Sequence, residues 1–155
     1  MRDFLFNQLK VVRTNTVDLV KGLSEGQVNS VPEGFNNNIL WNLGHIYLVQ
    51  ELFAFAFIPE PMLSPDGFSD LFGRGTKPSD WKVQPPTLPE LIQLLEDQTS
   101  RIEEKLNSRL DEVVAKPFAM PSGLILKTVG EFLTFSMYHE GMHFQTINIL
   151  KRFSA

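Results

Sequence analysis

The side chains with the clearest chemical potential are the three histidines of the chain, His45, His139 and His143. His139 and His143 stand four residues apart in a segment with helical periodicity, which places their Cβ atoms about 5–6 Å apart on one helix face. Two imidazoles at this spacing can bind one divalent metal. His45 falls in another helical segment, facing inward on the same side as Trp41, Leu48 and Leu52. The pattern predicts a metal site built from two facing helices.

Three imidazoles would leave the coordination sphere of such a metal incomplete, with a position open for water or substrate. An open position indicates chemistry or ligand binding rather than a structural role. The alternative is that the histidines are hydrogen-bonded core residues, which is the commoner role of a single inward-facing histidine. We favour the metal site because all three histidines fall on predicted core faces and none in a loop. Zinc, nickel, cobalt, copper and iron all suit three imidazole ligands.

Two better-known metal motifs overlap the last two histidines, and the sequence argues against both. The segment from His139 to His143 matches H-E-x-x-H, the zinc peptidase motif. Only twelve residues follow it, however, and none is His, Asp or Glu, so no downstream third ligand exists. Glu140 also points about 100° away from His139 around a helix, which suits a supporting or surface residue. The di-iron pattern needs a second Glu-x-x-His, which the sequence lacks.

Composition narrows the class of protein. The chain has 155 residues, 43% of them hydrophobic and 21% charged, which predicts a single globular domain over residues 1–155. Fourteen Lys and Arg against eighteen Asp and Glu give a net charge of −4, which argues against nucleic acid and anionic membranes as partners. The chain has no cysteine, so it has neither disulfides nor a thiol nucleophile of its own. The early charged residues argue against a signal peptide, and we expect a cytoplasmic location.

Helical periodicity predicts the elements that position the histidines. The first helix covers about residues 5–23, and the second runs from asparagine caps at 36–38 to about Ile58. The third and fourth begin at two capping boxes, Thr87-Leu88-Pro89-Glu90 and Thr128-Val129-Gly130-Glu131. Four such helices predict an all-α protein with a four-helix bundle fold.

A proline-rich connection of about 28 residues, 59–86, separates the second and third helices. Together with the first turn of the third helix it holds seven of the ten prolines. A loop of this length in a compact domain crosses between distant helices or covers a site. Its large apolar residues predict that it packs against the helices: Phe68, Leu71, Phe72 and Trp81.

Two local motifs, with the long connection between them, resemble the DinB-like family of metal-binding four-helix bundles. They are Trp41-Asn42-Leu43-Gly44-His45 in the second helix and Tyr138-His139-Glu140-Gly141-Met142-His143 in the fourth. The resemblance covers essentially the whole chain. It implies an up-down-down-up bundle, with the long connection joining the parallel middle helices. It also implies that His45, His139 and His143 form the family's triad, which binds zinc or nickel, and that the protein is a homodimer.

The family resemblance further implies a reaction, because its characterised members include S-transferases and isomerases that use thiols such as bacillithiol or mycothiol. Coordination to a divalent cation lowers the pKa of a thiol, and a chain without cysteine must take that thiol from a cosubstrate. We therefore expect a metal-dependent thiol S-transferase acting on a small-molecule substrate. Non-enzymatic binding of a small ligand or metal, and hydrolysis by metal-bound water, are the alternatives.

Other side chains bear on these alternatives. A polar group converging on the open position would favour catalysis, and Asn42, Tyr47 and Tyr138 are the nominal candidates, although each has a simpler structural explanation. Three phenylalanines in the second helix suggest a core or dimer contact, with the middle one expected to face outward: Phe53, Phe55 and Phe57.

Overall fold

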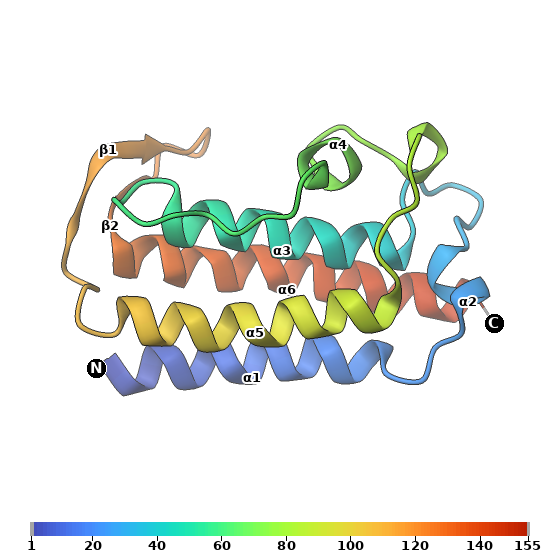
Figure 1. Cartoon of the computed structure of the whole chain (residues 1–155), viewed down its shortest axis with the longest axis horizontal. Helices are drawn as coiled ribbons and strands as arrows, with labels where there is room; N and C mark the ends of the chain where they lie inside the picture. Colours follow the sequence, from blue (N-terminus) through green and yellow to red (C-terminus); the bar gives the residue numbers. More distant parts are fainter. Residues whose placement is uncertain (1, 155) are drawn as a thin grey trace.

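The structure, a computed structural model, describes residues 2–154 and is mostly helical, as the sequence predicted (Figure 1). Four helices in this range are long: α1 (Arg2–Val20), α3 (Ile39–Phe55), α5 (Leu88–Leu106) and α6 (Val129–Phe153). They lie side by side, and α1 and α3 each contact both α5 and α6. In Figure 1, α1 and α6 run from left to right, whereas α3 and α5 run from right to left.

The long helices begin where the predicted caps stand. The Thr87 and Thr128 hydroxyls accept hydrogen bonds from the backbone N–H groups of Glu90 and Glu131. The carboxylates of these glutamates in turn accept hydrogen bonds from the backbone N–H groups of Thr87 and Thr128. At the start of α3 the Asn38 side chain accepts a hydrogen bond from the Trp41 N–H. Side-chain oxygens thus satisfy N–H groups that have no partner inside a helix. These caps fix where the two histidine-bearing helices begin.

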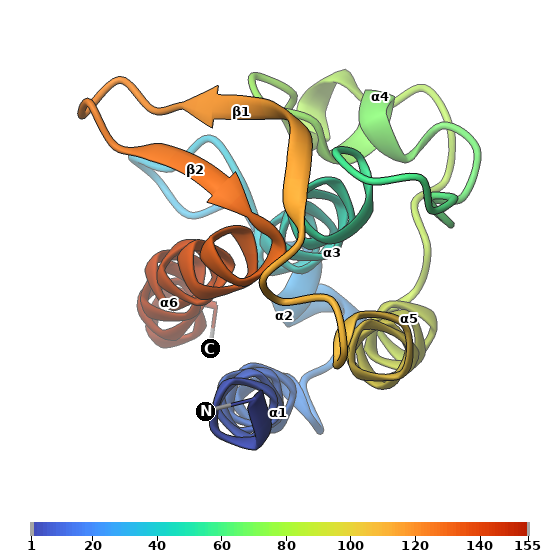
Figure 2. The same ribbon diagram turned by 90° about the vertical axis from the view of Figure 1, so that its left-hand side faces the viewer.

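Several small elements were not predicted from the sequence. They are the short helices α2 (Glu25–Asn29) and α4 (Phe68–Phe72), a 3-10 turn (Pro78–Asp80), and an antiparallel pair of strands, β1 (Val113–Ala119) and β2 (Ile125–Thr128). Alternation of apolar residues is confined to short pieces near Val113 to Phe118, which were too short to predict a strand. Each strand buries a single residue, Val114 in β1 and Leu126 in β2. The hairpin lies above α6 and α3 when the molecule is viewed from the end (Figure 2).

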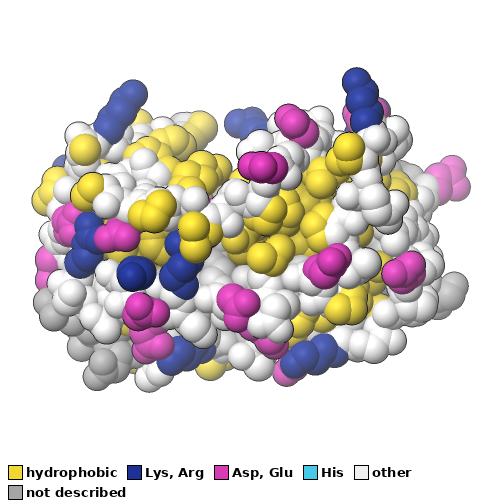
Figure 3. All heavy atoms as spheres, in the orientation of Figure 1, with side chains coloured by type: hydrophobic (Ala, Val, Ile, Leu, Met, Phe, Trp, Pro, Cys, Tyr) yellow, Lys and Arg dark blue, Asp and Glu magenta, His cyan; other side chains and the backbone are white. Residues whose placement is uncertain are grey.

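The connection between α3 and α5 packs against the protein, as its apolar residues predicted. Phe68, Leu71 and Phe72 of α4 are buried, and α4 contacts α3. The Trp81 indole N–H donates to the Leu71 carbonyl at 2.8 Å, which ties the end of the connection to α4. On the face drawn in Figure 3, hydrophobic side chains gather in patches between charged groups, and no described histidine is visible.

Two expectations about buried faces need correction. Leu52 was expected on the inward side of α3 with His45, but it is 38% exposed. Phe55 was expected to face outward, but it is buried, and the Arg101 guanidinium lies 4.1 Å from its ring centre. Its neighbours Phe53 and Phe57 are the half-exposed members of that set.

Among the helices described in residues 2–154, none combines the length and apolar character needed to cross a bilayer.

Candidate metal centre

The three histidines meet between α3 and α6. His45 projects from the second turn of α3, and His139 and His143 from successive turns of α6. Their ring centres are 4.6–5.3 Å apart, and one nitrogen of each lies within 4.8 Å of the others. The structure therefore brings together all three predicted residues in an arrangement that could hold one metal ion. Their assignment as metal ligands stays a prediction.

A backbone carbonyl fixes the protonation of His45. Its Nδ1 lies 2.6 Å from the carbonyl oxygen of Phe72, in α4. A carbonyl only accepts hydrogen bonds, so Nδ1 carries the proton and Nε2 keeps its lone pair. A histidine that binds a metal through one nitrogen usually donates its other N–H in this way.

An asparagine does the same for His143. The Asn42 side-chain N–H₂ donates to the Asn38 carbonyl at 2.7 Å, which turns the amide oxygen toward His143. That oxygen lies 2.8 Å from His143 Nδ1, so Nδ1 donates and Nε2 is again free. Asn42 is thus committed to orienting His143, and it is not directed at an open coordination position.

The other residues of the Trp41–His45 motif also hold His45 in place. The Trp41 ring stacks on the His45 ring at 4.6 Å with an angle of 11°. The Trp41 indole N–H donates to the Thr76 hydroxyl at 2.8 Å. At Gly44 a Cβ would lie 2.4 Å from the Phe72 ring, so any larger residue would push α4 away from α3. The motif therefore both orients His45 and lets the Phe72 carbonyl reach it.

Burial keeps the cluster neutral. Desolvation, and then the neighbouring histidines, lower the pKa of His139 to about 4 and that of His143 to about 3. Desolvation also lowers the pKa of His45, partly opposed by its bond to Phe72. All three imidazoles are uncharged at neutral pH, which is the form that binds metals.

The surroundings of the cluster are aromatic. Phe53 meets the His139 ring edge-on at 6.5 Å, and Trp41 lies 6.3 Å from the His143 ring. The remaining polar candidates are engaged elsewhere or exposed. The buried Tyr47 donates its hydroxyl to the Leu63 carbonyl, and Tyr138 is 62% exposed.

Glu140 is buried rather than a surface residue, and it binds Arg13 of α1. Sequence reasoning missed Arg13, although it occupies the buried stripe formed by Phe6, Leu9, Val17 and Val20. A charged residue on that stripe was a detectable signal of an inward partner. It also missed Phe72 as the partner of His45. The sequence does not indicate this bond, because it depends on where the folded connection places the Phe72 carbonyl.

Comparison with known proteins places the chain in a family. No curated protein matches it. A family model described as the DinB superfamily matches residues 8–147, from the second turn of α1 to the last third of α6. This span includes all three histidines, the Trp41–His45 motif and the proline-rich connection. The chain therefore belongs to the DinB superfamily.

Proposed function

We propose that the protein binds one divalent metal ion, zinc or nickel, through His45, His139 and His143, and that the metal activates the thiol of a small cosubstrate for transfer to an electrophile. The observation that carries the proposal is the hydrogen bonding of the imidazoles. His45 and His143 each donate Nδ1–H to an oxygen acceptor, which leaves two lone pairs in a cluster of three neutral rings. The donor set suits a borderline-soft cation with a ligand position to spare.

The proposed scaffold is the up-down-down-up bundle, with residues 59–86 crossing between parallel α3 and α5. The contacts of α1 and α3 with both α5 and α6 support it, as do the helix directions in Figure 1. In this arrangement two histidines come from α6 and one from its neighbour α3.

A divalent cation held by His45, His139 and His143 would lower the pKa of a coordinating thiol from about 8.5, so that thiolate would form at neutral pH. The thiol proton would pass to solvent, and the sulfur would attack the electrophilic carbon. A sulfur–carbon bond would form while the bond to the leaving group breaks, and the leaving group would take its electron pair. The chain contributes fixed imidazoles and two neighbouring aromatic rings, with Phe53 6.5 Å from the His139 ring and Trp41 6.3 Å from the His143 ring.

Non-enzymatic binding of a small ligand is the second candidate function, and one observation favours it. Asn42 and Tyr47 are committed to structural hydrogen bonds, and Glu140 is bound to Arg13. None of these three therefore has the freedom expected of a catalytic acid or base. A metal-activated water would have to react without help from them, so we do not favour hydrolysis.

Metal content is the first test. Untagged wild-type protein and a His139→Ala variant are reconstituted with zinc or nickel, freed of excess metal and measured by mass spectrometry. We expect about one ion per wild-type chain and its loss in the variant. No metal in the wild type after reconstitution would refute the proposal.

The thiol reaction is tested separately with metal-loaded protein, bacillithiol and monochlorobimane. We expect the conjugate to form, with release of chloride, faster than from thiol and electrophile alone. His139→Ala should give the uncatalysed rate. Metal binding without acceleration would reject this transferase assignment and favour the ligand-binding function.

A further inference from the structure

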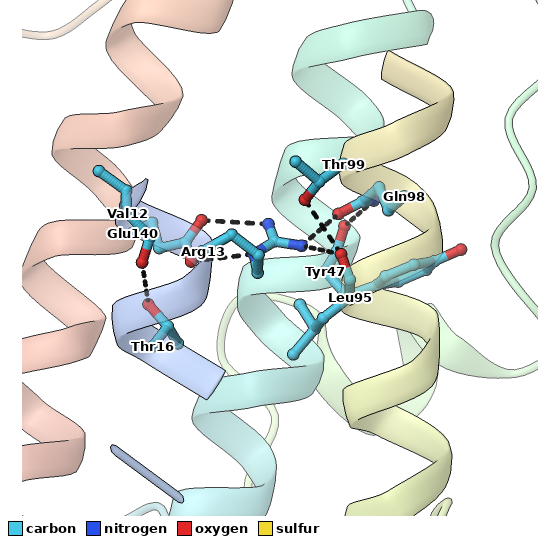
Figure 4. Close-up of polar contacts among 8 residues, drawn as sticks. All are labelled: Val12, Arg13, Thr16, Tyr47, Leu95, Gln98, Thr99 and Glu140. Atoms are coloured by element: carbon cyan, nitrogen blue, oxygen red, sulfur yellow. Dashed lines mark hydrogen bonds and ion pairs between the residues drawn. The ribbon is translucent and has the colours of Figure 1, made fainter. Parts of the chain in front are cut away.

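A second polar cluster crosses the core beside the histidines and joins all four long helices (Figure 4). Its centre is Arg13 of α1. The Arg13 Nε and Nη2 atoms each donate to one carboxylate oxygen of Glu140 in α6, both at 3.0 Å. Nη1 donates to the Leu95 carbonyl of α5 at 2.6 Å and to the Gln98 side-chain oxygen at 3.3 Å. One guanidinium thus connects three helices.

Gln98 extends the connection to α3. Its side-chain N–H₂ donates to the Tyr47 carbonyl at 2.9 Å and to the Glu51 carboxylate at 2.8 Å. Glu51 also accepts hydrogen bonds from Arg101 and from the Leu63 N–H. We call the series Glu140–Arg13–Gln98–Glu51 the polar chain. Its four members are between 0% and 5% exposed.

Stability alone is a weak explanation for this cluster. Removing charges from water is costly, and a buried ion pair is often no more stabilising than apolar side chains of similar volume. What a buried bidentate pair does provide is geometry, because its two parallel hydrogen bonds form at one relative orientation. The helices that carry such residues are held against both sliding and rotation about their axes.

The held helices are those that carry the histidines. Glu140 lies between His139 and His143 in α6, about 80° around the helix from the mean direction of the two imidazoles. Its bond to Arg13 therefore sets the direction in which both imidazoles point. Glu51 lies in α3, six residues after His45, and is held through Gln98 to the same guanidinium.

We propose that the polar chain positions the metal site, and that Arg13 and Gln98 are positioning residues that set the rotation of α6 and α3 so that three imidazoles converge. The inference rests on the proposed metal binding. It assigns a role to residues that touch neither the metal nor a substrate.

The test uses Co²⁺, whose visible absorption reports ligand geometry, and the double variant Arg13→Met/Glu140→Met. Both charges leave together, so neither stays buried without a partner. We expect the double variant to unfold near the wild-type midpoint. Its affinity for Co²⁺ should fall about tenfold or more, with a changed absorption spectrum. The control is Lys10→Met/Glu103→Met, which removes an exposed ion pair between α1 and α5 outside the polar chain and should leave affinity and spectrum unchanged.

A second variant, Gln98→Met, tests the same inference if the double variant does not fold. It leaves Arg13 paired with Glu140, and Glu51 paired with Arg101, but cuts the connection between them. We expect a weaker affinity and a shifted spectrum here too. Wild-type affinity and spectrum in a folded variant would overturn the positioning role while leaving the proposed function intact. Failure of the wild type itself to bind Co²⁺ would refute the metal site, and the inference with it.

Discussion

The histidine cluster and the polar chain share α6 and lie in the same core, but only the polar chain has its hydrogen-bond donors and acceptors matched. In the polar chain, Arg13 faces Glu140 and Gln98, and Gln98 in turn faces Glu51, so donors and acceptors are matched within the protein. In the histidine cluster three neutral bases face one another, and their described hydrogen bonds use only Nδ1 of His45 and His143. The nitrogens of the three rings lie close enough together that one cation could bind all of them. The first cluster is complete by itself, whereas we propose that a metal completes the second.

The largest expected effect comes from removing one partner of the buried ion pair in the polar chain. Arg13→Met leaves the Glu140 carboxylate buried without its partner, and we expect a loss of about 3–5 kcal/mol in the free energy of unfolding. Urea denaturation of the metal-free protein measures it. Lys10→Met, in an exposed pair with Glu103, should cost no more than about 1 kcal/mol. Equal losses in the two variants would mean that the polar chain is no better enclosed than a surface ion pair.

Adding metal should act on the histidine cluster alone. At a free zinc concentration 100 times the dissociation constant, we expect the free energy of unfolding to rise by about 2.7 kcal/mol. The rise should vanish in His139→Ala and persist in Lys10→Met/Glu103→Met. A similar rise in His139→Ala would place the bound zinc elsewhere.

Asn42 orients one histidine of the cluster, whereas Gln98 connects two members of the polar chain. Asn42→Leu removes the acceptor that holds His143 Nδ1–H, and we expect metal affinity to fall about 10–100-fold. Competition with a chromophoric chelator measures the change. Asn7→Leu, at an exposed amide of α1, is the control and should bind like the wild type. Unchanged affinity in Asn42→Leu would show that His143 needs no fixed acceptor.

The smallest effect, counted for one histidine over one pH unit, is a dependence of stability on pH in the metal-free protein. The pKa of an unfolded histidine is about 6.5, whereas His139 and His143 have folded values of about 4 and 3. Between these values the unfolded chain binds more protons, so stability is complete above pH 6.5 and falls as the pH drops toward 4. Each of the two histidines should contribute a slope of about 1.4 kcal/mol per pH unit between its unfolded and folded pKa values. Denaturation at several pH values should show a shallower slope in His139→Ala, and an equal slope would exclude the histidines as its source.

Sequence and structure agree where the controlling interactions are local. The capping boxes at Thr87 and Thr128 predicted the starts of α5 and α6, because a cap involves residues three apart. The pairing of His139 with His143 follows equally from helical spacing. The convergence of His45 with them depended on two helices facing each other, which the apolar patterns of those helices indicated.

The interactions that sequence reasoning missed join residues that are far apart in the chain. Arg13 and Glu140 are separated by 127 positions, and His45 and the Phe72 carbonyl by 27. Helical periodicity does not indicate which distant residues pair. Every residue has a backbone carbonyl, so the sequence does not mark the one that binds His45. The outward placement expected for Phe55 was wrong for a related reason: the Arg101 guanidinium that covers it comes from another helix.

The bond between His45 and the Phe72 carbonyl has a consequence for protein engineering. Three histidines transplanted onto a bare four-helix scaffold would reproduce the spacing of this site but would leave His45 free to carry its proton on either nitrogen. A graft that also carries residues 59–86 and retains Gly44 brings the carbonyl with it. A transplanted site therefore needs the proline-rich connection as well as the helices that carry and position the histidines.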